Sequence, residues 1–207
     1  MKKPNAGSIC FRVIEESQYK KTWKKMRLFT VNREKDTLDE IWFVQHSPVF
    51  TLGQAAKPEH LLIRKEIPVV KSDRGGEITY HGPGQLVVYL LLDLARRKMG
   101  IKELVSFTEG LIIDLLRDHG VRAYSVSGAP GVFVGERKIA FLGFRVRKGR
   151  TYHGFSLNVD MDLRPFSMIN PCGFEGLEIV DLNMLGKNPG MEVLIDDIRT
   201  MFGSTLH

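Results

Sequence analysis

Residues 132–159 are rich in β-branched and aromatic side chains and are interrupted only by short turns. Strand-forming runs joined by tight turns predict an antiparallel meander. The predicted strands are 132–134, 139–146 and 155–159, with turns at Gly135-Glu136 and 148–150. Such a meander favours an α+β fold over a fold in which a helix follows every strand.

Helical patterns lie on both sides of this meander. Apolar residues recur at helical spacing in 17–30, in 103–119 and in a last helix that Asn188-Pro189 is expected to open. Further short strands are predicted at 41–44, 49–52, 68–70 and 85–92. We therefore expect an α+β fold with mixed β-sheets packed against helices. Because no repeat or linker divides the chain, we expect one domain over residues 1–207.

The charge is uneven along the chain. The formal net charge is +6, and residues 1–35 hold ten Lys and Arg against three acidic residues. A basic surplus raises the alternative of a nucleic-acid-binding module, but aromatic residues do not interleave with the basic ones as base stacking requires. We therefore expect no nucleic-acid partner.

Cysteine usage and hydropathy bear on the compartment. Two cysteines, Cys10 and Cys172, make a disulfide scaffold improbable for this length and favour a reducing compartment. No apolar stretch follows the charged start, and the longest apolar run, 86–92, is too short to span a bilayer. The expectation is a cytoplasmic protein without a membrane partner.

The segment from Arg74 to Gln85 contains four glycines and a proline in twelve residues. Such a composition is typical of a tight connection between strands, or of a loop that lets a ligand approach the backbone. It matches neither a phosphate-binding loop nor a dinucleotide-binding loop. The histidines have no zinc-ligand spacing, so no metal is predicted, and His153 is interpreted as structural.

Two residues are candidates for nucleophilic chemistry. Cys172 lies in an irregular stretch between Pro171 and Gly173, where a thiol meant for packing is unusual, whereas Cys10 fits the packing role. Period-two alternation places Lys138 on the apolar side of its strand, although a lysine at a strand end can also extend its ammonium to water. A thiol beside such a lysine is a nucleophile with a proton-transfer partner.

Several segments together resemble the lipoyl(octanoyl) transferase family. The motifs that carry the resemblance are Pro48-Val49-Phe50-Thr51-Leu52-Gly53-Gln54, Arg74 to Gln85, Gly131-Val132-Phe133-Val134, Lys138-Ile139-Ala140, Tyr152-His153-Gly154, 157–163 and Ile169-Asn170-Pro171-Cys172-Gly173. The resemblance covers nearly the whole chain. It implies the catalytic fold that the family shares with biotin and lipoate protein ligases.

The resemblance also implies an activity. An octanoyl group would pass from octanoyl-acyl carrier protein to a lysine ε-amine on lipoyl domains of 2-oxoacid dehydrogenase complexes and on the glycine cleavage H protein. Neither a metal nor a cofactor is implied, because a thioester supplies the acyl group. An ATP-dependent lipoate or octanoate ligase of the same fold is the alternative enzyme.

The family's site residues transfer to this chain by position. The acyl-thioester cysteine falls on Cys172, and the lysine that lowers its pKa falls on Lys138. The substrate-contacting positions fall on Arg74, Gly75, Gly76, Glu77, Ile78, Thr79, Tyr80, His81, Phe141, Leu142, Gly143, Gly154, Phe155 and Ser156.

Two further expectations concern specificity. The family commonly has Gly-Tyr-Pro where this chain has Val88-Tyr89-Leu90, which is expected to reshape the wall of the acyl site. A basic run from Arg137 to Arg150 contains no acidic residue. We expect it to form a rim near the thiol that speeds the encounter with acidic protein substrates.

Overall fold

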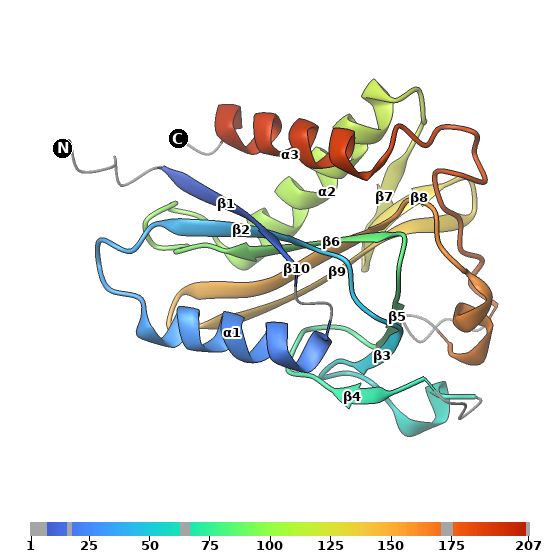
Figure 1. Cartoon of the computed structure of the whole chain (residues 1–207), viewed down its shortest axis with the longest axis horizontal. Coiled ribbons are helices and arrows are strands. Elements are labelled where there is room, and N and C mark those ends of the chain that lie inside the picture. The colour runs from blue at the N-terminus through green and yellow to red at the C-terminus, as the bar shows by residue number, and fades with distance from the viewer. Residues whose placement is uncertain (1–7, 16–17, 63–66, 171–175, 206–207) are drawn as a thin grey trace.

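The structure is a computed structural model that describes residues 8–15, 18–62, 67–170 and 176–205 (Figure 1). The α-helices of these ranges are α1 (Tyr19–Asn32), α2 (Ile101–Asp118) and α3 (Met191–Thr205). The strands are β1 (Ile9–Ile14), β2 (Asp39–Val44), β3 (Val49–Leu52), β4 (Val69–Lys71), β5 (Ile78–His81), β6 (Gln85–Leu91), β7 (Tyr124–Val126), β8 (Ala129–Val134), β9 (Arg137–Arg147) and β10 (Arg150–Asn158). None of the described helices combines the length and apolar character needed to cross a bilayer.

Two sheets organise the chain. In the described residues, seven strands form one sheet in the order β1-β2-β6-β10-β9-β8-β7, and β4-β3-β5 form a smaller one. Figure 1 shows α2 and α3 on one face of the large sheet, and α1 with the small sheet on the other. The β8-β9-β10 meander is antiparallel, as predicted, and the α+β expectation is confirmed.

The central position of β6 in the core explains why its sequence is an almost continuous apolar run. All seven of its residues are buried, because helices or the small sheet cover both faces of the large sheet. Val88 and Leu90 pack with Leu111 and Leu115 of α2 on one face. Tyr89 packs with Met26 of α1 on the other, which confirms the helix predicted from the spacing in 17–30.

The structure corrects several predicted boundaries. Strands β1 and β7 were not predicted. Strand β5 lies inside the glycine-rich segment, and it pairs in a different sheet from β6, so this segment is not a hairpin connection. The last helix begins at Met191 rather than at Asn188-Pro189, because the Asn188 side chain accepts the Gly190 N–H in a turn before the helix.

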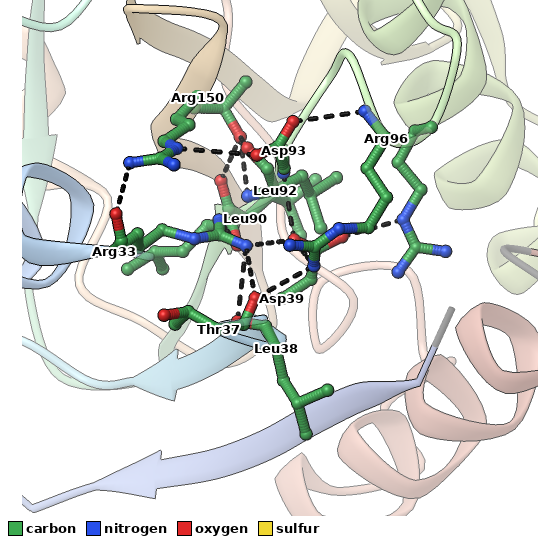
Figure 2. A network of polar contacts seen from close by, with 12 residues as sticks. Arg33, Thr37, Leu38, Asp39, Leu90, Leu92, Asp93, Arg96 and Arg150 are labelled. Atoms are coloured by element: carbon green, nitrogen blue, oxygen red, sulfur yellow. Dashed lines mark hydrogen bonds and ion pairs between the residues drawn. The ribbon is translucent and has the colours of Figure 1, made fainter. Parts of the chain in front are cut away.

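A buried ionic network joins the end of α1, the start of β2 and the segment after β6 (Figure 2). Asp39 is fully buried and accepts bonds from Arg33, from Arg97 Nε at 2.7 Å and from Arg96 Nη1 at 3.5 Å. Arg33 also donates to the Leu91 carbonyl at 2.9 Å. One carboxylate therefore holds three guanidinium groups from two separate segments.

Candidate active site

One cavity lies between the small sheet, α1 and strands β6, β9 and β10. Its space is about 490 Å³, including the part open to solvent. It is lined by Tyr19, Arg74, Gly76, Glu77, Ile78, Thr79, His81, Val87, Tyr89, Phe141, Leu142, Gly143, His153, Gly154, Phe155 and Ser156. The structure thus brings three sequence segments that we predicted as substrate-contacting to one place.

Two of the predicted substrate-contacting residues do not line this cavity. Tyr80 alternates to the opposite face of β5, where its ring packs against Phe50 and Phe166. Gly75 lines a neighbouring cleft, and its N–H donates to the Phe144 carbonyl at 2.9 Å. Tyr80 therefore packs the far side of β5, and Gly75 forms part of the wall of the neighbouring cleft.

Arg74 holds the glycine-rich loop. Its guanidinium donates to the Thr51 carbonyl at 2.6 Å, to the Glu77 carbonyl at 2.7 Å and to the Gly75 carbonyl at 2.9 Å. Since these bonds engage the backbone, they fix the loop beside the cavity. Gly53 permits this arrangement, because a Cβ there would lie 2.1 Å from the Gly76 carbonyl oxygen.

A polar and aromatic cluster occupies the end of the cavity next to α1. Asp73 accepts bonds from Trp23 Nε1 at 2.8 Å, from Tyr152 Oη at 2.6 Å and from His153 Nε2 at 3.0 Å. Partial burial opposes ionisation of Asp73, but these hydrogen bonds, led by that of His153, outweigh it and lower its pKa to about 2. Asp73 is therefore a carboxylate at neutral pH.

The neighbouring histidines are neutral. Burial and, to a lesser extent, electrostatic repulsion by His46 lower the pKa of His81 to about 3. Burial also lowers the pKa of His153. His81 Nδ1 lies 2.7 Å from Gln85 Oε1 and, because an amide oxygen only accepts, must donate to it. The cavity end thus carries imidazoles with fixed tautomers.

Thermal stability is expected to fall as the pH drops below about 6.5. Between this ordinary pKa and about 3, unfolded chains protonate His81 while the folded chain does not, so the free energy of unfolding decreases with decreasing pH. Melting curves from pH 7 to pH 5 measure the slope. A His81→Phe variant should show a shallower slope, and an unchanged slope would contradict the assignment.

Lys138 lies at the start of β9 and is buried, with 1% of its surface exposed. Its Nζ donates to the Pro130 carbonyl at 2.8 Å and lies 5.2 Å from the ring centres of Phe133 and Phe141. A register shift opposite Val132 and Phe133 interrupts the strand alternation here. The prediction that this lysine points inward is confirmed.

Lys138 lines a second cleft that adjoins the first. The two share Gly76, Glu77, Leu142 and Gly143 as a common wall, and the second is otherwise lined by Gly75, Ile101, Val105, Gly128, Ala129, Pro130, Lys138 and Phe144. Glu109 of α2 accepts the Gly131 N–H at 2.9 Å and so holds the segment that binds the ammonium. A substrate that reaches Lys138 through this cleft therefore meets the end of the first cavity.

Gly131→Ala is expected to lower the rate of acyl transfer about 10²-fold by displacing Lys138. A Cβ at Gly131 would lie 2.3 Å from Lys138 Cε, 2.6 Å from the Ala140 carbonyl oxygen and 2.8 Å from Lys138 Nζ, so it presses on both the lysine side chain and the β9 backbone that carries it. Gly135→Ala is the matched control, because Gly135 also has a positive φ but has no atom within 4 Å of an added Cβ. Equal losses of steady-state rate in both variants would contradict the displacement of Lys138.

Cys172 lies outside the described residues. The described chain stops at Asn170 and resumes at Gly176. The Asn170 N–H donates to the His60 carbonyl at 2.9 Å, and the Lys138 N–H donates to the Glu178 carbonyl at 2.9 Å. The chain therefore runs beside β9 at Lys138 six residues after Cys172.

The structure corrects the expectation about Val88 and Leu90. Both side chains face the core with α2, whereas Val87 and Tyr89 of the same strand line the cavity. Their backbone is close to the site, since a Cβ at Gly154 would lie 2.1 Å from the Val88 carbonyl oxygen. The side chains that differ from the family pattern therefore do not form the cavity wall.

The expected basic rim near the thiol stays a prediction, since Cys172 lies outside the described residues. Arg147 and Lys148 are exposed at the far end of β9, nine residues or about 30 Å along the strand from Lys138. Arg145 donates to Gln54 Oε1 at 2.6 Å, and Arg150 donates to the Arg33 carbonyl at 2.7 Å. Arg145 and Arg150 of the basic run therefore make hydrogen bonds within the protein.

Sequence reasoning missed four lining residues: Tyr19, Val87, Tyr89 and His153. Val87 and Tyr89 alternate on one face of β6, a signal that the apolar run concealed because both faces are buried. Tyr19 comes from α1, which no local pattern connects to the cavity. Among the described residues, no group of three or more His, Cys, Asp or Glu side chains is placed to hold a metal ion.

Comparison with known proteins agrees with this architecture. A lipoate protein ligase of Thermoplasma acidophilum, solved as part of a lipoylation system with its E2 lipoyl domain, has a TM-score of 0.75 at 16% identity and covers 96% of this chain and 83% of its own. The biotin protein ligase of Aquifex aeolicus has a TM-score of 0.55 at 12% identity, covering 96% and 68%. At these identities the likeness shows the fold alone.

Sequence comparison gives the family. The Lipoyl protein ligase A/B catalytic domain matches residues 18–203. The octanoyltransferase of Xanthomonas axonopodis pv. citri is 52% identical over 94% of this chain and 86% of its own length, and that of Dechloromonas aromatica is 59% identical over 78% and 79%. The chain therefore belongs to the lipoyl protein ligase A/B catalytic domain family and, within it, to the octanoyltransferases, which are acyltransferases of protein lipoylation.

Proposed function

We propose that residues 1–207 form one catalytic domain that carries the octanoyl group on Cys172 between two protein substrates. The donor is octanoyl-acyl carrier protein, and the acceptors are lysines on lipoyl domains of 2-oxoacid dehydrogenase complexes and on the glycine cleavage H protein. The observation that carries the proposal is a buried lysine, Lys138, beside the cavity that the predicted substrate-contacting segments line.

In the first half-reaction the Cys172 thiolate attacks the thioester carbon of the donor. A new S–C bond forms, the bond to the carrier's sulfur breaks, and the carrier leaves as a thiol with a proton from the Lys138 ammonium, which leaves Lys138 neutral for the second half-reaction. Lys138 stabilises the attacking thiolate with its positive charge. Exchange of one thioester for another is nearly isoenergetic, so no nucleotide is required.

In the second half-reaction the acceptor amine attacks the acyl carbon. The amide bond forms, the S–C bond to Cys172 breaks, and Lys138 takes the proton that the amine loses. Because the amide is more stable than the thioester, this step runs downhill. The acyl chain occupies the first cavity in the meantime, whose walls at Phe141, Leu142 and Phe155 are apolar.

Intact-mass measurement after mixing with octanoyl-acyl carrier protein tests the intermediate. The wild-type chain and a Cys10→Ala variant should each gain one octanoyl group, and Cys172→Ala should gain none. Octanoylation of Cys172→Ala would overturn the proposal. ATP-dependent pyrophosphate release with free octanoate would instead favour the ligase alternative, for which the sequence relatives give no support.

A further inference from the structure

The cavity has a direction that the strand register defines. Lys138 precedes Phe141 by three residues on β9, and Phe141 pairs with Ser156 of β10. Two residues further along, Gly143 pairs with Gly154, which pairs with Tyr89 of β6. An acyl group attached near Lys138 therefore lies across the sheet face at Phe141 and Ser156 and points its ω end towards Gly154 and Tyr89.

His153 stands at this far end in a strained backbone conformation. Its φ is +60°, which non-glycine residues rarely adopt outside sites that constrain them. In a regular strand Tyr152 and His153 would point to opposite faces, yet both contact Asp73. The strain thus brings the imidazole to the cavity side, with its ring centre 6.4 Å from that of Tyr19 and 6.1 Å from that of Tyr89.

Asp73 defines which nitrogen of His153 accepts. A carboxylate can only accept, so His153 Nε2 carries the proton that bonds to Asp73 at 3.0 Å. Burial lowers the pKa of His153, which leaves Nδ1 as a lone-pair acceptor at neutral pH. Nδ1 is buried and makes no hydrogen bond to any residue that the structure describes.

Two other lining residues share this property. Thr79 Oγ1 and Ser156 Oγ are also buried without a hydrogen-bond partner in the described part of the chain. Buried polar atoms in folded proteins are nearly always satisfied, so these three point to a ligand atom or a bound water within the cavity. Ser156 pairs with Phe141, where the thioester oxygen can accept from its hydroxyl, whereas His153 Nδ1 needs a donor that an apolar chain does not supply.

We propose that the His153 end of the cavity binds a hydrogen-bond donor at the ω end of the acyl chain, so that the enzyme takes ω-hydroxylated medium-chain acyl groups in addition to octanoyl. The inference rests on the proposed function, in which the chain of the acyl-enzyme occupies this cavity. With a plain octanoyl group, a water molecule takes the place of the hydroxyl.

Competition between two thioesters of equal size tests the site. The 8-hydroxyoctanoyl and nonanoyl groups have the same number of non-hydrogen atoms and differ only in O–H against CH3. From an equimolar mixture of their small-molecule thioesters, wild-type Cys172 should load the hydroxylated group about threefold to tenfold in excess, which is the net effect of one hydrogen bond. Intact mass gives the ratio, and an excess of nonanoyl in the wild type would overturn the proposal.

Two variants locate the effect. His153→Phe removes the acceptor and should reverse the ratio in favour of nonanoyl. His153→Asn, which tolerates positive φ, guards against misfolding and should bring the ratio near one. His119→Asn, at a histidine paired with Asp197 outside the cavity, should keep the wild-type ratio. Equal ratios in the wild type and both His153 variants would contradict the inference.

Loading with octanoyl alone separates this inference from the proposed function. If the wild type gains no octanoyl group, or if Cys172→Ala gains one, the acyl-enzyme itself is wrong. If octanoyl loads on Cys172 but the His153 variants have the same ratio of hydroxylated to nonanoyl product as the wild type, only the ω-end site is wrong.

Discussion

A Lys138→Met variant is expected to lose about 10²–10⁴-fold of the octanoyl-transfer rate, the range that one positioned proton-transfer group contributes. Its free energy of unfolding should stay the same or rise. The buried Lys138 ammonium lies near Phe133, Phe141 and the Pro130 carbonyl, and methionine fills such a space without a charge to bury. Loss of activity without loss of stability is typical of a residue placed for function.

Steady-state transfer to a lipoyl domain and chemical denaturation measure the two quantities. Lys148→Met is the matched control, since Lys148 is exposed at the opposite end of β9, and it should change neither. Lys138→Arg should not restore the rate, because a guanidinium does not accept the amine's proton. If Lys138→Met retains at least a third of the wild-type rate, the catalytic assignment is wrong.

Elements with one buried face and one solvated face were predictable. In α2, Leu104, Leu111 and Leu115 recur at helical spacing, and the structure buries all three. The β8-β9-β10 meander followed from short turns, which leave antiparallel pairing as the simplest connection. Local pattern suffices where the physical cause of an element is local.

Elements that depend on contacts with residues distant in the sequence were missed. Strand β1 is an edge strand that pairs in parallel with β2, and its partner is thirty residues away. The burial of Asp39 reflects Arg33 beyond the end of α1 and Arg97 after β6, which only the completed fold brings together. No spacing rule reports such contacts.

The candidate site divides in the same way. The glycine-rich segment, Phe141–Gly143 and Gly154–Ser156 follow from resemblance, and strand register explains why they meet. The role of His153 did not follow from sequence, because its backbone leaves the strand alternation at φ +60°. Its interpretation as purely structural overlooked its position in the cavity wall.

The largest expected effect on stability is that of Asp39→Asn. The carboxylate and the Arg33 side chain are both fully buried, and the Arg97 side chain is 4% exposed. Removing the negative charge breaks these buried ion pairs, which typically costs about 3–5 kcal/mol. Chemical denaturation of the folded variant should show this loss in the free energy of unfolding.

Asp114→Asn is the control for this change, because Asp114 makes an exposed ion pair with Arg117 and should cost at most about 1 kcal/mol. A double change, Asp39→Asn with Arg33→Met, separates charge from packing. Once the Arg33 guanidinium is absent, Asp39→Asn breaks one buried ion pair fewer. The double variant should therefore lose less free energy of unfolding than the sum of the two single variants. Strictly additive losses would mean that Asp39 stabilises the fold through its shape and not through its charge. In that case, other contacts would have to align the active-site strands β6 and β10.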